Sequence, residues 1–231
     1  VTVATSVGIK RTIRSQTFRG YFKPKERNVR AAEEVEIIEI LQACTNTRDQ
    51  LLLLMIAETG FRIGEILGVD YTRDIDYQRK TVRVYFRDDN ENEARAKNAE
   101  HRRARISDET FEFLLSYLNE YRELLQRGTF LFINIEGDRA GKPMMVGSVY
   151  DMLKRMEKKT GHKITPHMLR RYFARSRRQE NWNLEMISMA LGHKHLDTTI
   201  KYLGNLDDKL LEASKEFYEK HSELYGIDRL L

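Results

Sequence analysis

The stretch ITPHMLRRYFA, residues 164–174, carries both a fold signal and a chemical signal. Pro166 near a first turn indicates the start of a helix, which we expect to run over residues 166–179. His167 and Arg170 stand three residues apart, so their side chains share one face of that helix. Taken alone, the pair is as well explained by a capping histidine and a surface arginine as by a functional site. Features elsewhere in the chain distinguish these two interpretations.

Length and charge limit the class of protein. The 231 residues, of which 41% are hydrophobic, suffice for a core in one large domain or two small ones. A net charge of +5 and a pI near 9.2 suit a polyanionic partner. Basic side chains gather in residues 1–30 and 154–178, whereas residues 205–231 lean acidic. The charge is therefore sorted onto separate faces.

Cysteine usage and apolar runs point to a compartment. The single cysteine, Cys44, is expected to be a buried thiol in a reducing compartment. The longest apolar run, LLLLMIA, ends at Glu58 and is far shorter than the roughly 20 residues of a membrane span. The N-terminal stretch lacks the apolar segment of a signal peptide. We expect a soluble, cytoplasmic protein that does not bind membranes.

Hydrophobic periodicity predicts a mainly α fold with one small antiparallel sheet, an α+β class. Residues 80–86, KTVRVYF, alternate like a strand, and residues 103–107, RARIS, can return antiparallel to them. Gly60 is expected to end a helix. The predicted helices start at Ala31 and at Asp108 (about twenty residues, an estimate from the apolar period) and cover 48–59, 62–67, 146–161, 166–179, 184–191, 197–203 and 207–225. In the first of them, one apolar stripe is expected to hold Val35, Ile38, Leu41 and Cys44.

Two motifs that suggest a ligand fail on inspection. GDRAGKP, residues 137–143, is one residue short of a phosphate-binding loop and has proline at the hydroxyl position. The segment from Asp88 starts like a calcium loop, but Glu93 stands where glycine is needed and Ala99 where the bidentate carboxylate belongs. His and Cys residues show no zinc spacing. No metal site is predicted.

Two further segments carry candidate functional residues. ETGFRIGEILGV, residues 58–69, places Arg62 and Glu65 three apart, although a surface ion pair would explain that fragment alone. LGHKHLDTTIKY, residues 191–202, places His193 after the helix-ending Gly192 and puts Tyr202 on the next helix.

Together the three segments resemble the three main boxes of the tyrosine recombinase (phage integrase) family, over residues 31–204. That family has an arginine in the first box, a lysine on a β-hairpin, His-x-x-Arg in the second box, and Leu-Gly-His with a tyrosine nine residues later in the third. Carried over, the expected catalytic residues are Arg62, Lys97, His167, Arg170, His193 and Tyr202.

The resemblance implies DNA strand transfer, and the chemistry fits the residue types. A tyrosine hydroxyl with a pKa near 10 needs a base and a positive field to attack a phosphodiester. Planar guanidinium groups match the charge that gathers on the phosphoryl oxygens, and a lysine can protonate the leaving 5′-oxygen. His167 would be the base and His193 a donor to the phosphate. Such a 3′-phosphotyrosyl intermediate needs no cofactor or metal.

Supporting roles and partners follow from the same resemblance. Glu65 is expected to support Arg62 structurally, and the partners are double-stranded DNA and further subunits of a homotetramer on DNA. Additional phosphates would be bound by Arg171, Arg175, Arg177 and Arg178. Arg171 stands where many relatives have histidine.

Several alternatives stay open. The register of the Lys97 hairpin can shift, and His195 is the alternative to His193. The rivals of Tyr202 as nucleophile are Tyr172, Tyr218 and Tyr225. A type IB topoisomerase or a telomere resolvase would share the chemistry, and a DNA-binding protein could keep the fold without turnover.

The resemblance also divides the chain. Residues 1–30 are expected to be a basic arm or a linker remnant, and residues 31–204 the catalytic domain. Residues 205–231 are expected to form a helix that packs on its own domain or is exchanged between subunits. Family members usually carry an additional N-terminal DNA-binding domain, so we expect this chain to be a catalytic fragment.

Overall fold

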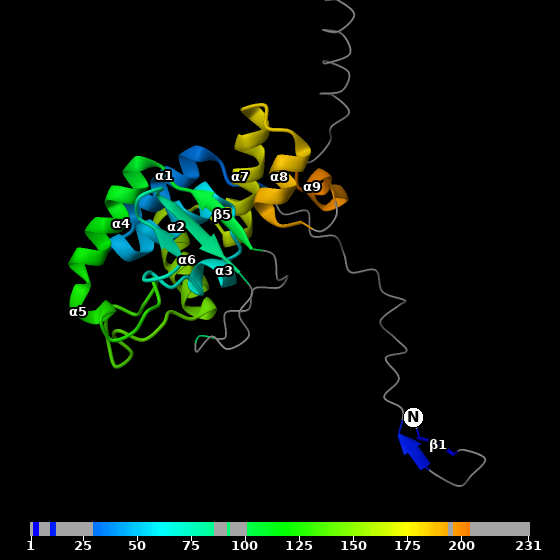
Figure 1. The fold of residues 1–231 in the computed structure, drawn as a ribbon, viewed down its shortest axis with the longest axis horizontal. Coiled ribbons are helices and arrows are strands. Elements are labelled where there is room, and N and C mark those ends of the chain that lie inside the picture. Colours follow the sequence, from blue (N-terminus) through cyan, green and yellow to red (C-terminus); the bar gives the residue numbers. More distant parts are fainter. Residues whose placement is uncertain are drawn as a thin grey trace, which may run out of the picture.

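The computed structural model describes residues 2–4, 10–12, 30–85, 92, 101–193 and 196–203. The predicted α+β class is confirmed, with helices around a small three-stranded sheet (Figure 1). The helices are α1 (Glu34–Ala43), α2 (Thr47–Thr59), α3 (Ile63–Leu67), α4 (Asp108–Glu120), α5 (Arg122–Leu125), α6 (Val146–Thr160), α7 (Pro166–Gln179), α8 (Leu184–Leu191) and α9 (Leu196–Leu203). The strands are β1 (Thr2–Ala4), β2 (Lys10–Thr12), β3 (Ile75–Asp76), β4 (Thr81–Val84) and β5 (Arg102–Arg105). Lys97 and the predicted helix 207–225 lie outside the described residues.

The three-stranded sheet has the order β3-β4-β5, with both pairings antiparallel, and β1 pairs with β2 in a second antiparallel sheet. The predicted antiparallel pairing is confirmed for Thr81–Val84 with Arg102–Arg105, and β3 is an additional short strand. Val82 lies opposite Ala104, and Val84 lies opposite Arg102. Residues opposite each other share a face of the sheet, and Val82 and Val84 are both buried. Arg102 and Ala104 therefore lie on the face of the sheet that points toward the interior of the protein.

Helix α2 is the centre of the core. Leu51, Leu52, Leu53, Met55 and Ile56 are all buried, so this helix is covered on every side. It packs against both α4 and α7. The apolar run LLLLMIA is therefore a core helix. Within the described ranges, no helix has the length and apolarity that crossing a membrane requires.

Helix α1 corrects one prediction. Its buried residues are Ile37 and Ile40, whereas Val35 and Ile38 of the predicted stripe are exposed. Apolar residues follow one another so closely in EVEIIEIL that two overlapping stripes were available. The predicted stripe did not take into account a line of polar contacts along the helix. These contacts, the polar seam, show which of the two stripes faces the core.

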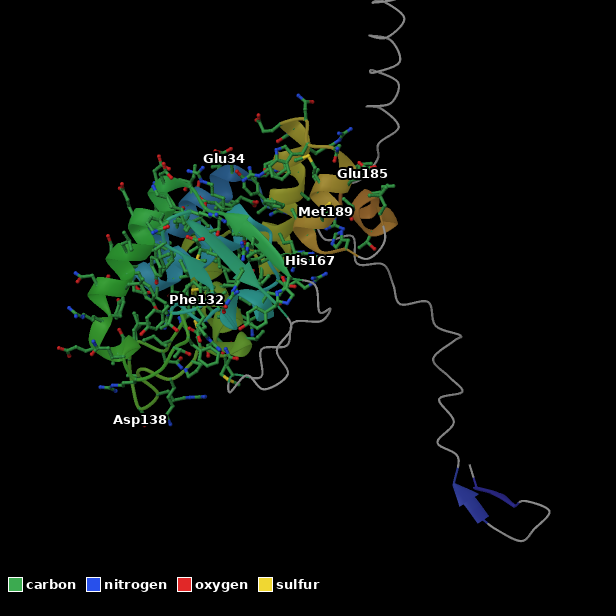
Figure 2. All side chains as sticks on the ribbon, viewed as in Figure 1. Glu34, Phe132, Asp138, His167, Glu185 and Met189 are labelled. Atoms are coloured by element: carbon green, nitrogen blue, oxygen red, sulfur yellow. The ribbon has the colours of Figure 1, made fainter. Side chains whose placement is uncertain are left out.

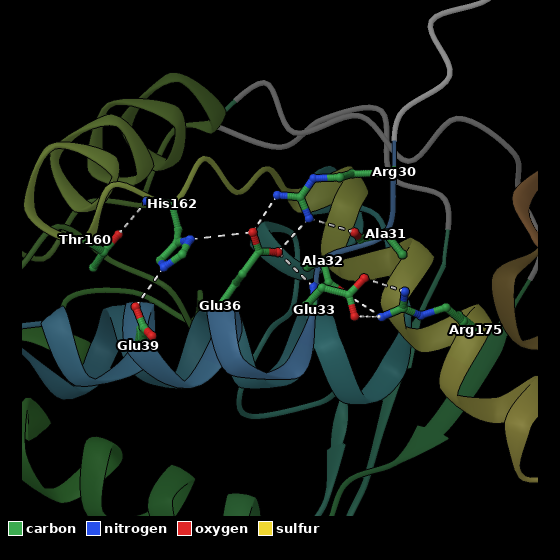
Figure 3. A network of polar contacts seen from close by, with 9 residues as sticks. All are labelled: Arg30, Ala31, Ala32, Glu33, Glu36, Glu39, Thr160, His162 and Arg175. Carbon is green, nitrogen blue, oxygen red and sulfur yellow. Dashed lines mark hydrogen bonds and ion pairs between the residues drawn. The ribbon is translucent and has the colours of Figure 1, made fainter.

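That polar seam joins α1 to the segment before α7 (Figure 3). Arg30 binds both carboxylate oxygens of Glu36, which lowers the pKa of Glu36 to about 2. His162 contacts Glu39 through Nε2 at 2.8 Å and lies 3.6 Å from Glu36. With Glu36 and Glu39 held in this way, Ile37 and Ile40 turn toward the core.

Candidate active site

Arg170 joins the ends of two helices that are far apart in the sequence. Its Nη1 donates to the carbonyl of Gly60, after α2, and its Nη2 donates to the carbonyl of Leu191 at 2.6 Å, at the end of α8. The carboxyl end of a helix carries partial negative charge, so a guanidinium is favourable there. Only 2% of Arg170 is exposed, so it is buried where these two helix ends meet.

Both helices end on glycine for a geometric reason. Gly60 has φ +64° and Gly192 has φ +61°, values that side chains disfavour. These left-handed ends bring the last carbonyls of α2 and α8 to the arginines. The stop predicted at each glycine is confirmed.

Arg62 approaches the same place from the start of α3. Its Nη2 donates to the carbonyl of Gly192 at 3.3 Å, and its Nη1 contacts Oε1 of Glu65 at 2.9 Å. The backbone N–H of Arg62 donates to Oε2 of the same carboxylate at 2.7 Å. Glu65 is buried, whereas 29% of the Arg62 side chain is exposed. Arg62 therefore lies closer to solvent than Arg170 does.

The two predicted histidines lie within the field of these arginines. The protein atoms around the ring lower the pKa of His167, and so do the charges of Arg171, Arg170 and Arg62. Burial lowers the pKa of His193 to about 3, with further contributions from the charges of Arg170 and Arg62. Both imidazoles are therefore neutral at pH 7.

Thr199 connects His193 to α9. Its hydroxyl lies 2.9 Å from Nδ1 of His193, and the threonine is fully buried. Helix α9 packs against α7 and α8 and carries Tyr202 three residues after Thr199. The backbone of Tyr202 belongs to the described residues, but its side chain does not. Lys97 and His195 lie outside them entirely.

Figure 2 sets this site apart from the rejected phosphate loop. His167 lies on the side of the molecule where Met189 of α8 is also labelled, and Asp138 of the loop lies at the other end. The structure thus brings together Arg62, Glu65, His167, Arg170 and His193 from three segments.

Arg102 is a member of the site that the sequence did not single out. Its Nη2 forms an ion pair with Oε1 of Glu65, and its Nη1 donates to the carbonyl of Ala190 at 3.0 Å. Its guanidinium lies over the ring of Phe61 at 5.3 Å from the ring centre. Alternation of inward and outward residues along the strand is the signal that could have identified Arg102. Because three of the four residues of β5 are arginines, the sequence does not show which of them points inward.

The arginines predicted to bind further phosphates have partners within the protein. Arg175 forms a two-pronged ion pair with Glu33, with both distances 2.7 Å (Figure 3). Arg177 lies over the rings of Phe173 and Trp182. Nη1 of Arg178 donates to the carbonyl of Trp182. Arg171 is half-buried beside His167. Their contact with DNA stays a prediction.

Comparison with known proteins decides the family. Residues 27–209 match the phage integrase family. The chain belongs to the phage integrase family. The resemblance on the three boxes is thereby confirmed.

Relatives of this phage integrase family chain include recombinases and a transposase. Transposase A from transposon Tn554 of Staphylococcus aureus is 32% identical over 200 residues, which are 86% of this chain and 55% of that protein. Tyrosine recombinase XerA of Saccharolobus solfataricus is 30% identical over 198 residues, 83% of this chain and 59% of that protein. The chain thus spans little more than half the length of these relatives.

A solved structure agrees with the fold of this family member. The crystal structure of XerA recombinase superposes with a TM-score of 0.64 at 25% identity, covering 83% of this chain and 64% of that one. Helices and sheet therefore follow the catalytic-domain fold of tyrosine recombinases.

We predict that Gly192→Ala loosens this integrase-family site. A β-carbon at Gly192 would stand 2.6 Å from Cζ of Arg102, and φ +61° is strained for any side chain. Gly161→Ala is the matched control, because Gly161 also ends a helix at φ +77° with nothing within 4 Å of an added β-carbon. The strain alone costs about 1–2 kcal/mol at either position. Urea unfolding should show a clearly larger loss for Gly192→Ala, and equal losses would contradict this packing.

We also predict that acid destabilises the chain through His193. An unfolded histidine takes up a proton below a pKa of about 6.5, whereas the folded pKa of His193 is about 3. Between these values the unfolded state binds more protons, so stability falls as the pH is lowered. Urea unfolding at pH 7.5 and 5 should show a smaller pH dependence for His193→Gln than for the unaltered chain. Identical dependence in both proteins would contradict the lowered pKa.

Proposed function

We propose that this chain is the strand-transfer part of a site-specific DNA recombinase that cleaves and rejoins DNA through a 3′-phosphotyrosyl intermediate. The observation that supports this most strongly is the meeting of Arg62, Arg170, His167 and His193 around the ends of α2 and α8. Family membership and relatives named as recombinases and a transposase support the same function.

In the proposed reaction, the hydroxyl oxygen of Tyr202 attacks the phosphorus and its proton passes to His167. A phosphorus–oxygen bond forms to the tyrosine as the bond to the 5′-oxygen breaks, and Lys97 protonates that oxygen. The pKa of tyrosine lies about three units above neutral pH, so ionising it costs roughly 4 kcal/mol. A neutral base and two cations offset this cost. The lowered pKa of His167 keeps the imidazole unprotonated at neutral pH, which is the form that can accept the proton. Attack by a 5′-hydroxyl on the phosphotyrosine reverses these steps and rejoins the strand.

The arginines and His193 would stabilise the charge that develops on the phosphate. A guanidinium has five N–H groups, and the carbonyl contacts of Arg170 fix the plane of its fork. For His193 we propose that the hydroxyl of Thr199 donates to Nδ1. The neutral ring then carries its proton on Nε2, which can donate to the phosphate.

Partners and domain roles belong to the same proposal. Residues 31–204 would act as the catalytic domain on double-stranded DNA inside the cell, within a homotetramer. Residues 1–30 would form a basic arm, and residues 205–231 a helix that is exchanged between subunits. Arg171, Arg175, Arg177 and Arg178 would bind neighbouring phosphates, and Arg175 would exchange Glu33 for DNA.

The test is the capture of a covalent complex. The chain is incubated with labelled duplexes that have a randomised core and a nick, so that the cleaved fragment diffuses away and the reaction cannot reverse. We expect a protein–DNA species that survives denaturation and disappears on protease treatment. Binding without any such species would favour a DNA-binding protein without turnover.

A second assay separates recombination from relaxation. Once the captured duplexes reveal a preferred sequence, two copies are placed on one supercoiled plasmid. A recombinase excises the segment between the copies, whereas a type IB topoisomerase only relaxes the plasmid and a telomere resolvase leaves hairpin ends. We expect excision.

A further inference from the structure

We propose that Arg102 is a positioning residue, which orients Glu65 and through it Arg62. This inference rests on the proposed function, because its consequence is a loss of strand cleavage. It concerns a residue at the beginning of β5, outside the three segments that carry the resemblance.

The register of the sheet turns Arg102 inward. Arg102 lies opposite Val84, which is buried, and its neighbour Arg103 is exposed on the other face of the strand. Only 8% of the Arg102 side chain is exposed, although arginine is usually a surface residue. A buried guanidinium needs compensation by charge and hydrogen bonds.

The carboxylate of Glu65 provides the charge that compensates Arg102. Oε1 of Glu65 contacts both Nη2 of Arg102 and Nη1 of Arg62. Oε2 accepts the backbone N–H of Arg62. One buried carboxylate is thus held between two guanidinium groups, and its orientation sets the orientation of Arg62.

Three other contacts fix Arg102 itself. It donates to the carbonyl of Ala190 and lies over the ring of Phe61, the residue before Arg62. Its guanidinium also occupies the space beside Gly192 in which any larger residue would place a β-carbon. Arg102 therefore links the sheet to the start of α3 and to the end of α8, the two places from which Arg62 and His193 enter the site.

The two arginines have different exposure, which separates their roles. Arg62 is the more exposed of the pair, at 29% against 8%, so under the proposed function it is the one that a phosphate can reach. Removing Arg102 would leave the carboxylate with one cation and allow both to turn. Catalysis is sensitive to such changes, since a misplacement of about 1 Å can cost on the order of a hundredfold in rate.

The experiment compares Arg102→Gln and Arg102→Lys with Arg103→Gln. Arg103 is the matched control because it is on the same strand and its replacement removes the same charge from the exposed face. Adduct formation is followed in a single turnover at saturating nicked DNA. We expect both Arg102 variants to lose about 10- to 100-fold in rate, with DNA affinity within about threefold of that of Arg103→Gln. A rate equal to that of the unaltered chain in Arg102→Lys and Arg102→Gln would overturn the proposal.

A double-mutant cycle asks whether Arg102 acts through Glu65. If it does, adding Arg102→Gln to Glu65→Gln lowers the rate little further, because the carboxylate is already lost. Fully additive losses would mean that Arg102 acts independently, and the proposal would be wrong.

A spectroscopic readout distinguishes failure of this inference from failure of the proposed function. If the unaltered chain forms no adduct at all, the proposed function fails, but the side-chain Nε–H resonance of Arg62 still reports its orientation. We expect this resonance to shift in Arg102→Lys and to stay unchanged in Arg103→Gln. An unchanged resonance in Arg102→Lys would overturn the positioning role whatever the activity is.

Discussion

Tyr202→Phe is expected to bind DNA as tightly as the unaltered chain and to form no covalent adduct. Phenylalanine keeps the ring but lacks the oxygen that would bond to phosphorus. We expect adduct formation to fall by at least about a thousandfold. Filter binding and denaturing gels with nicked duplexes measure the two properties separately.

The other tyrosines provide the controls for this substitution. Tyr172 is partly buried against the core, on the same helix as Arg170, so Tyr172→Phe should keep both binding and adduct formation. Tyr218→Phe and Tyr225→Phe test the two rivals in residues 205–231. An undiminished adduct in Tyr202→Phe, together with a lost one in any of these three, would move the nucleophile to that residue.

Arg170→Ala is expected to lose both cleavage and stability. The carbonyls of Gly60 and Leu191 would lose their donor in a buried place, at a cost of about 1–3 kcal/mol each. Under the proposed function, loss of this guanidinium would lower the cleavage rate by about a hundredfold to a thousandfold. Urea unfolding and single-turnover adduct formation measure the two effects.

Arg62→Ala is the comparison that separates these effects. Arg62 is more exposed than Arg170, and among the described residues it has one carbonyl contact that crosses between segments, with Gly192. We expect a comparable loss of cleavage with a smaller loss of stability. If Arg170→Ala unfolds at the same urea concentration as the unaltered chain, Arg170 does not hold α2 and α8 together.

Much of the fold could be predicted because its signals are local. Gly60 and Gly192 end their helices through a backbone angle that glycine alone tolerates well, and Pro166 marks the start of α7. The alternation in KTVRVYF identifies β4. The pairs Arg62 with Glu65 and His167 with Arg170 were visible from their spacing of three.

What escaped prediction depends on contacts between distant segments. Burial of Arg102 follows from its pairing with Val84, and the sequence of β5 does not state that register. Nothing in the sequence distinguishes Thr199 from other helix residues, because its contact with His193 appears only in the folded structure. Which of the two apolar stripes of α1 is buried depends on the contacts of Glu36 and Glu39. The partners of these glutamates include His162, in another part of the chain.

The basic residues of α7 also show that the sequence predicts where charge gathers but not which partners the charged side chains have. Counting charges marks residues 154–178 as a surface for an anion, but it does not reveal that Arg175 is already paired with Glu33. Such an exposed ion pair contributes little stability, and DNA phosphates can compete for the arginine.

In the proposed reaction Tyr202 becomes joined to a 3′-phosphate of DNA. The most direct measurement is mass spectrometry of the trapped adduct after digestion with trypsin and nuclease. We predict a nucleotide on a peptide that contains Tyr202, with the cleaved strand ending in a free 5′-hydroxyl. A nucleotide on a peptide that lacks Tyr202, or a free 3′-hydroxyl at the cleaved end, would contradict it.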